Sequence, residues 1–265
     1  MRPLSELSRD ACRLVRVVLA DIDDTMTRDG KLPAESYQAM WDLSAAGVSV
    51  IPVTGRPAGW CDLISRQWPV SGIVGENGAF VFYMDGEHRR TVSHPRAPEP
   101  ETNRERLAAI AREVYELVPG TRPAKDQFAR LYDVAVDFRE EPPLLDFAVA
   151  ARIKEIFESH GARAKVSSIH VNAWFGDYDK LSMAQLYLRD HLGLDLRDEA
   201  ANRLAVFCGD SPNDEPMFAA FENSVAVANI RPFLSDLEHP PAYVSEQESA
   251  AGFVELAGMI LSARS

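Results

Sequence analysis

Short apolar runs that end in polar residues constrain the fold of this chain more than any other feature. Residues 14–20 are rich in Val and Leu and stop at an acidic cluster, and residues 48–53 stop at a Thr-Gly-Arg sequence. Such β-branched runs are typical of strands in a parallel sheet that is covered on both faces. Residues 34–46 have helical spacing, and residues 57–67 begin with a proline that suits the first turn of a helix. With a third run at 73–74, this alternation predicts an α/β fold with a doubly wound, Rossmann-like parallel sheet.

The alternation of strands and helices breaks after residue 82 and returns near residue 176. The stretch between them begins with many Pro, His, Arg and Glu residues and then fits helices at 101–118 and 144–159 and strands at 128–138, 163–167 and 169–175. After it, the parallel pattern continues with helices at 180–192, 213–221 and 249–262 and strands at 204–208, 224–227 and 243–244. We therefore expect one core made from residues 1–82 and 176–265, with an α+β domain inserted at residues 83–175.

Charge and composition exclude several classes of partner. The 28 Lys and Arg residues are outnumbered by 40 Asp and Glu residues, which gives a formal net charge of −12. An acidic surface repels nucleic acids and anionic membranes, so we expect neither as a partner. The sequence has no apolar run long enough for a signal peptide or a membrane span, and its three cysteines form no CxxC pair. These features predict a cytoplasmic protein that acts on a small molecule. They leave open whether it is a monomer or a homodimer.

Polar clusters follow the expected strands, at the edge of an open parallel sheet where ligands bind. The first cluster, residues 21–25, reads Asp-Ile-Asp-Asp-Thr and places three carboxylates within four residues. These carboxylates repel one another, so they are stable together mainly when a cation lies among them. Taken alone, the cluster also fits a solvated acidic turn that caps a helix.

Three further clusters occur at equivalent places along the chain. Residues 54–56 read Thr-Gly-Arg, in which glycine allows a close approach to a ligand and the Thr hydroxyl suits a phosphate oxygen. Lys180 opens a helix after the insert, where a lysine also fits a solvated position. Asp210 ends a strand and Asp214 lies in the first turn of the next helix. A helix cap accounts for one of these acids better than it accounts for both.

The order of these clusters resembles that of the haloacid dehalogenase superfamily. A DxDDT sequence is followed by Thr-Gly-Arg after the next strand, then by Lys180, and then by a GDxxND sequence at residues 209–214. The match runs through both halves of the expected core. The inserted domain and the GDSPND form are similar to the type-IIB branch, which includes Cof-like sugar phosphatases, sucrose- and trehalose-phosphate phosphatases and phosphomannomutase.

This resemblance implies a magnesium-dependent phosphatase. Asp21 would attack phosphorus and form an aspartyl-phosphate, while Asp23 would protonate the leaving oxygen and later deprotonate the attacking water. Mg²⁺ would be held by Asp21, the backbone carbonyl of Asp23 and Asp210, with Asp214 bound directly or through water. Many relatives have glycine after the acid/base Asp, whereas this chain has Asp24.

The resemblance also implies a set of substrate contacts. Thr54 and Lys180 would bind the oxygens of the transferring phosphoryl group, where charge is greatest. Gly55 would let the backbone approach the ligand. Arg56 and Asn77 match positions that face the substrate in relatives.

The inserted domain would be a cap that closes over the site, excludes water and selects the substrate. Alternation places His170, Asn172 and Trp174 on one face of a strand, and this polar and aromatic face suits a sugar. Further cap candidates are Arg122, Lys125 and Arg130. The basic residues also fit a solvated surface, and Trp174 also fits the core of the cap.

Hydrolysis of a small phosphorylated metabolite, a sugar phosphate, is the function that these features favour. A phosphosugar mutase is an alternative, because it uses the same aspartyl-phosphate but returns the phosphoryl group to a sugar. A receiver-like signalling domain is a more distant alternative, since it also pairs an acceptor Asp with Thr, Lys and Mg²⁺. Receivers lack the large insert, and their extra acids precede the acceptor.

Overall fold

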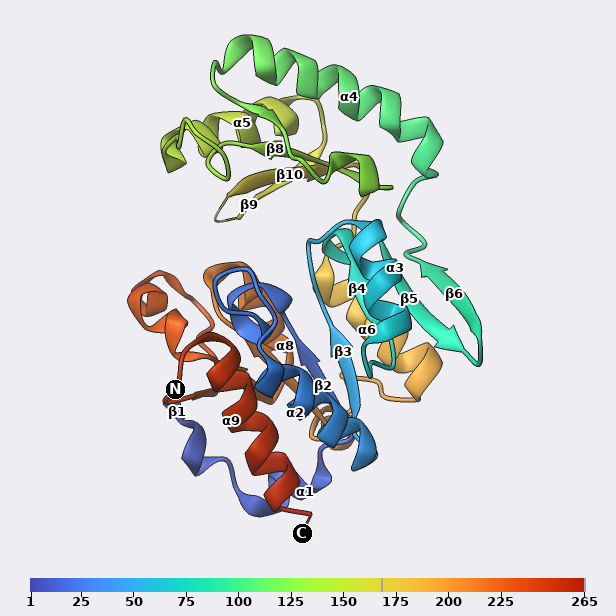
Figure 1. Ribbon diagram of the computed structural model, residues 1–265, viewed down its shortest axis with the longest axis vertical. Helices are drawn as coiled ribbons and strands as arrows, with labels where there is room; N and C mark the ends of the chain where they lie inside the picture. The colour runs from blue at the N-terminus through green and yellow to red at the C-terminus, as the bar shows by residue number, and fades with distance from the viewer. Residues whose placement is uncertain (168, 265) are drawn as a thin grey trace.

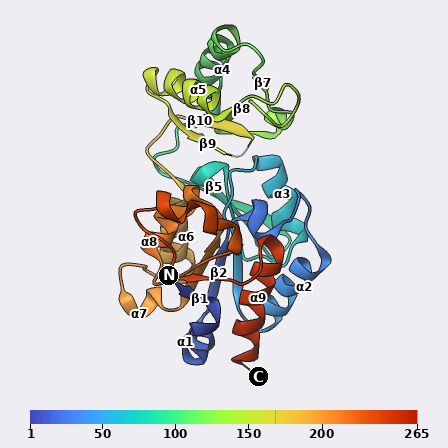
Figure 2. The ribbon, with the colours of Figure 1, turned by 90° about the vertical axis from the view of Figure 1, so that its left-hand side faces the viewer.

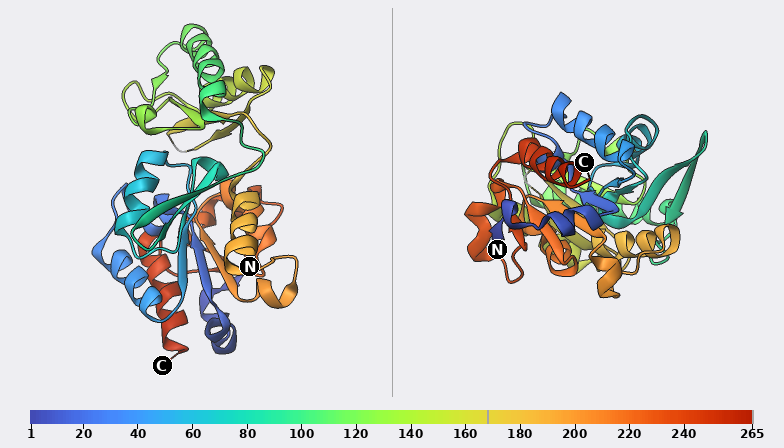
Figure 3. Two further views of the ribbon diagram at one scale, coloured as in Figure 1. Left: turned by 90° about the vertical axis from the view of Figure 1, so that its right-hand side faces the viewer. Right: turned by 90° about the horizontal axis from the view of Figure 1, so that it is seen from below.

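The computed structural model describes residues 1–167 and 169–264 (Figure 1). These residues form a larger part that contains both termini and a smaller part that lies over one end of it (Figure 1). We call the smaller part, residues 100–174, the insert unit. The chain enters it after strand β6 and leaves it after strand β10 (Figures 1 and 3).

The larger part is built on a parallel sheet. Within the described residues this sheet has six strands, in the order β1 (Arg2–Pro3), β13 (Tyr243–Val244), β12 (Asn223–Ala226), β11 (Ala205–Gly209), β2 (Val17–Ala20) and β3 (Ser49–Pro52). Every neighbouring pair runs parallel. The order reverses direction around β2, as expected of a doubly wound sheet, so the predicted fold class is confirmed.

Helices cover both faces of this sheet (Figure 2). They are α1 (Arg9–Leu14), α2 (Ala34–Ala45), α3 (Ala58–Gln67) and α9 (Ser249–Ser262) on one side, and α6 (Lys180–Leu192), α7 (Glu199–Asn202) and α8 (Glu215–Ala220) on the other. Strand β2 shows the effect on the core. Val18 packs in the apolar cluster that includes α2 and α9, whereas Leu19 packs in the cluster that includes α6 and α8. Burial on both faces explains the continuous apolar runs of the sequence.

A β-hairpin extends the larger part beyond the boundary that we expected after residue 82. Strand β4 (Ile73–Gly75) lies beside β3 through a parallel bridge, and it pairs with β5 (Phe80–Asp85), which pairs in turn with β6 (His88–Ser93). Phe80 and Phe82 of β5 are buried and stack on each other. The turn between β5 and β6 contains Gly86 at φ 61°, and an Asp-Gly pair at this place is a strong hairpin signal. The charged residues after position 83 therefore form the exposed strand of a hairpin.

The insert unit is a helix-covered antiparallel sheet. Its strands follow the order β7 (Arg122–Pro123), β8 (Asp133–Asp137), β10 (His170–Trp174) and β9 (Arg163–Val166), and its helices are α4 (Pro100–Leu117) and α5 (Phe147–Ser159). Both helices lie on the face that points away from the larger part (Figure 1). The strand that we expected from residue 128 begins only at Asp133, because residues 127–129 form a single 3₁₀ turn that leaves Phe128 91% exposed.

Alternation along β10 divides its side chains between two environments. Val171 and Ala173 pack against α4 and α5 in the apolar core of the insert unit. His170, Asn172 and Trp174 therefore share the opposite face, as the sequence predicts. None of the helices in the described part of the chain combines the length and the apolar character that a membrane span requires.

Candidate active site

A cavity of about 630 Å³ lies between the carboxyl edge of the parallel sheet and the insert unit. We call it the main cavity. From the larger part it is lined by Asp21, Asp23, Arg56, Asn77, Lys180 and Asp210, and from the insert unit by Arg130, Lys165, His170 and Asn172. Several of the residues predicted from the sequence, contributed by both parts of the molecule, therefore meet in one place.

Asp21 and Lys180 form the centre of this site. Asp21 directly follows β2, and the Lys180 ammonium group donates to its Oδ1 at 2.5 Å and to Oδ1 of Asp214 at 3.3 Å. Lys180 is the first residue of α6, and a capping box between Asp179 and Ser182 fixes the start of that helix. The lysine that fitted a solvated surface is only 8% exposed.

Burial and neighbouring charges set the pKa values of Asp21 and Lys180. Burial raises the pKa of Asp21 to about 7, with Asp214 and Asp23 acting in the same direction and Lys180 against it. Burial opposes the charged form of Lys180, but Asp21 and Asp214 outweigh it and raise the pKa of the ammonium group. Lys180 thus stays charged and orients the Asp21 carboxylate.

Asp210 and Asp214 gather beside Asp21. The backbone N–H of Asp210 donates to Asp214 Oδ2 at 3.2 Å, and the Thr25 hydroxyl donates to Asp210 Oδ1 at 3.4 Å. Position 209 needs glycine, because a Cβ atom there would lie 2.5 Å from Asp214 Oδ2. Burial, together with Asp214 and Asp21, raises the pKa of Asp210 to about 9. Acids this close to one another favour a proton or a metal cation among them.

The donor set of these acids fits Mg²⁺. Among the described residues, no three Asp, Glu, His or Cys side chains stand close enough together to form a complete cluster of metal ligands. Mg²⁺ does not require such a cluster, because proteins commonly hold it with one or two carboxylates, waters and a substrate phosphate. The carboxylate oxygens of the buried Asp21 and Asp214 and of the partly buried Asp210 supply hard oxygen ligands of this kind, and the carboxyl pKa is raised at Asp21 and Asp210.

Asp23 lies in an irregular turn after β2 and is held by Arg56. The guanidinium group of Arg56 donates to both carboxylate oxygens of Asp23, at 2.7 and 3.0 Å, and stacks over the Trp60 ring. The Asp23 side chain remains 43% exposed. Asp24, the next residue, has a φ of 57°, a left-handed conformation that glycine adopts at no cost and Asp tolerates. This geometry explains why glycine suits that position.

Hydrogen bonds join the loop after β3 to the loop after β4, beside the acidic residues of the site. The Thr54 backbone N–H donates to the Val74 carbonyl, and the Thr54 hydroxyl accepts from the Arg56 N–H. The hydroxyl proton has no acceptor among residues 1–167 and 169–264, so it remains available to a ligand. Asn77 donates its backbone N–H to the Thr54 carbonyl, and a Cβ atom on Gly55 would approach the Asn77 amide to 3.1 Å. Gly55 and Asn77 line the main cavity, whereas Thr54 is buried and does not belong to the lining that the described residues form.

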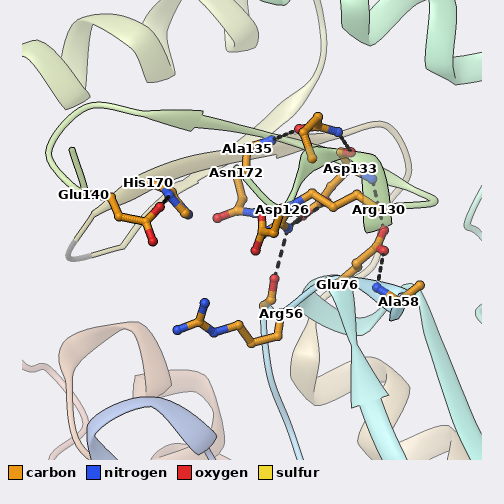
Figure 4. Close-up of polar contacts among 12 residues, drawn as sticks. Arg56, Ala58, Glu76, Asp126, Arg130, Asp133, Ala135, Glu140, His170 and Asn172 are labelled. Carbon is orange, nitrogen blue, oxygen red and sulfur yellow. Dashed lines mark hydrogen bonds and ion pairs between the residues drawn. The ribbon is translucent and has the colours of Figure 1, made fainter. Parts of the chain in front are cut away.

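The predicted face of β10 is only partly over the main cavity. His170 contacts Glu140 at 2.8 Å, and Asn172 donates to Asp133 at 2.9 Å, and both residues line the cavity (Figure 4). Trp174 is 4% exposed and stacks on Tyr178, outside the part of the main cavity that described residues form. It borders a second cavity of about 430 Å³ instead.

The basic candidates of the insert unit have different surroundings. Arg122 pairs with Asp137 and Lys125 with Glu141, and neither belongs to the described lining of the main cavity. The Arg130 side chain is buried, pairs with two carboxylates of its own unit, and donates to the Gly55 carbonyl at 3.1 Å (Figure 4). Arg130 therefore ties the insert unit to the Thr-Gly-Arg loop.

Two functional residues were missing from the sequence prediction. Glu76 is fully buried, and its carboxylate accepts the backbone N–H groups of Ala58, Leu131, Tyr132 and Asp133 at 2.6–3.2 Å (Figure 4). Burial and the nearby Asp133 raise the pKa of Glu76 to about 7. Lys165 of β9 donates to the Asn213 carbonyl at 2.5 Å. Both join the insert unit to the larger part.

We expect Glu76→Gln to lower the free energy of unfolding by about 1–3 kcal/mol. The substitution replaces one carboxylate oxygen by an NH₂ group, so the backbone N–H groups that donate to that oxygen lose their acceptor. Denaturant unfolding would measure the loss. Glu35→Gln is the matched control, since the Glu35 side chain is 52% exposed and its ion pair spans 4.0 Å. Equal stability of both variants and the wild type would show that the Glu76 contacts contribute nothing.

Comparison with known proteins identifies a family and similar structures for this chain. The family model for sucrose-6F-phosphate phosphohydrolase matches residues 14–259. A HAD/COF-like hydrolase from Plasmodium vivax has a TM-score of 0.71 at 18% identity, over 96% of this chain and 99% of that one. A comparison with curated proteins finds no matching sequence.

Two sugar-phosphate phosphatases share the fold. The C-terminal domain of C. albicans trehalose-6-phosphate phosphatase has a TM-score of 0.69 at 16% identity, over 99% of both chains. The sucrose-phosphatase of Synechocystis, solved in complex with sucrose and phosphate, has a TM-score of 0.61 at 17% identity, over 94% of this chain and 98% of that one. With the family model covering nearly the whole chain, the protein belongs to the sucrose-6F-phosphate phosphohydrolase family, and it is a phosphatase of the haloacid dehalogenase superfamily, in its type-IIB branch.

Proposed function

We propose that this phosphatase is a Mg²⁺-dependent phosphomonoester hydrolase that forms an aspartyl-phosphate and acts on a sugar phosphate. The observation that carries this proposal is the buried pair of Asp21 and Lys180 at the end of β2. A carboxylate fixed by a lysine at the carboxyl edge of the sheet, with a second acid two residues later, suits nucleophilic attack on phosphorus.

The first step needs three side chains. An Asp21 oxygen forms a bond to phosphorus while the bond from phosphorus to the leaving oxygen breaks, and Lys180 stabilises charge on the phosphoryl oxygens. Asp23 gives its proton to the leaving oxygen. In the second step Asp23 takes a proton from water, which attacks phosphorus and frees Asp21. Arg56 and Asp23 form an ion pair at 2.7 Å. This ion pair must weaken when the Asp23 carboxylate takes up a proton.

Asp21, Asp210 and Asp214, with the backbone carbonyl of Asp23, would hold Mg²⁺. When bound, the ion neutralises the charge of the phosphate group. The Thr54 hydroxyl, whose proton is uncommitted, would donate to a phosphoryl oxygen.

The insert unit would act as the cap. It supplies one wall of the main cavity, where His170 and Asn172 offer polar groups to the leaving alcohol. The named activities of the C. albicans and Synechocystis relatives support a sugar phosphate as substrate. We assign the substrate contact on β10 to Asn172 and His170, because Trp174 packs against Tyr178 beside the main cavity.

We expect the protein to release phosphate from members of a panel of phosphorylated sugars when Mg²⁺ is present. Activity should vanish in a chelator and return with excess Mg²⁺, because buried acids alone repel a phosphate dianion. Ca²⁺ should inhibit, since it prefers more ligands and looser geometry. Colorimetric phosphate release measures all three conditions. Full activity in chelator would refute the metal requirement, and no release from any ester would refute the proposed function.

A further inference from the structure

Lys165 reaches from the insert unit to the acidic loop of the larger part. It belongs to β9, and its ammonium group donates to the backbone carbonyl of Asn213 at 2.5 Å. Asn213 directly precedes Asp214, which contacts Lys180. One side chain of the insert unit therefore ends beside the groups that surround Asp21.

Lys165 differs from the other cations of the main cavity. Arg56 pairs with Asp23, Arg130 pairs with carboxylates of its own unit, and Lys180 pairs with Asp21. None of the ion pairs found in residues 1–167 and 169–264 joins Lys165 to a carboxylate. Lys165 is partly buried. Partial burial of an ammonium group whose acceptor is a neutral carbonyl costs free energy that a bound anion would offset. Burial and the neighbouring Lys180 accordingly lower the pKa of Lys165 to about 8.

The place where the main cavity meets a second cavity shows where such an anion would lie. The second cavity shares Asn77, Lys165 and Lys180 with the main cavity, so these three residues stand where the two cavities meet. All three carry hydrogen-bond donors. The side-chain amide nitrogen of Asn77 is buried and has no hydrogen-bond partner among the described residues. Two ammonium groups and an uncommitted amide N–H together suit the oxygens of a phosphate group.

We propose that Lys165 binds the phosphoryl oxygens of the substrate together with Lys180 and Asn77. This inference rests on the proposed function and adds a phosphate contact that comes from the insert unit. The insert unit then holds the group that is transferred as well as the leaving alcohol, and phosphate binding depends on the insert unit lying over the site.

Binding of inorganic phosphate to the Mg²⁺-loaded protein, measured by isothermal titration calorimetry, tests the proposal without turnover. Lys165→Met should raise the dissociation constant about tenfold or more, because a charge-assisted hydrogen bond is lost. Lys165→Arg should keep most of the affinity. Lys154→Met is the matched control and should bind as the wild type does, since Lys154 lies on α5, borders only the second cavity and stands 3.7 Å from Glu158.

Unchanged phosphate binding by a folded Lys165→Met, or equal weakening in Lys165→Met and Lys154→Met, would overturn the proposal. If the Met variant does not fold, Lys165→Gln replaces it, because Gln removes the charge but keeps a donor. A wild type that hydrolyses esters while Lys165→Met binds phosphate normally refutes this inference alone. A wild type that releases no phosphate from any ester refutes the proposed function.

Discussion

Asp21→Asn should reduce kcat by about 10⁴-fold or more, because an amide cannot replace the carboxylate that attacks phosphorus. Asn matches the shape of Asp, and its oxygen can still accept the Lys180 hydrogen bond, so the fold should persist. Phosphate release from the best sugar phosphate would measure the loss, and circular dichroism would report the fold.

Asp24→Asn is a matched control for this variant. It removes a neighbouring carboxylate that also lines the main cavity but has no part in the proposed chemistry. Asn tolerates the positive φ of this position at least as well as Asp does. Asp24→Asn should therefore keep most of its activity. A folded Asp21→Asn that turns over near the wild-type rate would overturn the assignment of the nucleophile.

Asp23→Asn should slow hydrolysis of a sugar phosphate by about 10²- to 10⁴-fold, the range that general acid catalysis supplies. The alkoxide of a sugar leaves poorly without a proton, whereas p-nitrophenolate leaves without help. With p-nitrophenyl phosphate, the variant should therefore form the aspartyl-phosphate quickly and hydrolyse it slowly, because the base for the second step is lost. Stopped-flow absorbance should show a burst of one p-nitrophenolate per active site.

The ion pair between Asp23 and Arg56 calls for a second variant. Asp23→Asn removes the charge partner of Arg56 as well as the acid, whereas Arg56→Met removes the same pair and leaves the carboxylate. Arg56→Met should lower activity without the burst. A burst in both variants, or equal losses by Asp23→Asn on both substrates, would assign Asp23 to positioning instead of proton transfer.

The sequence predicted the features that depend on residues close together along the chain, namely the strands, the helix starts and the polar clusters beside them. Strand β2 is apolar on both faces, and that pattern was enough to place Asp21 at the end of a buried parallel strand. The clusters that contain Asp21, Lys180 and Asp210 each follow a strand or open a helix, so the edge of the sheet brings them together. These local rules account for the fold class and for the position of the acids in the main cavity.

The contacts between the insert unit and the larger part could not be predicted in this way, because they join residues that are far apart along the chain. Glu76 was not predicted, because three of the four backbone N–H groups that it binds lie 55–57 residues away along the chain. Lys165 was not predicted either, because its acceptor, the Asn213 carbonyl, lies 48 residues away along the chain. Alternation put Trp174 on the correct face of β10, but it does not say how far along a strand a cavity extends.

Glu76 attaches the insert unit to the larger part through main-chain groups, which affects how such proteins can diversify. Its carboxylate holds three consecutive main-chain amides of the insert unit, and the main chain is the same whatever side chains occupy positions 131–133. Any residue except proline provides the N–H group. Selection on substrate preference can therefore change an exposed side chain of this segment, such as Leu131, without undoing its attachment. An insert unit from another protein should attach at Glu76 if one of its loops presents three backbone N–H groups in the same arrangement.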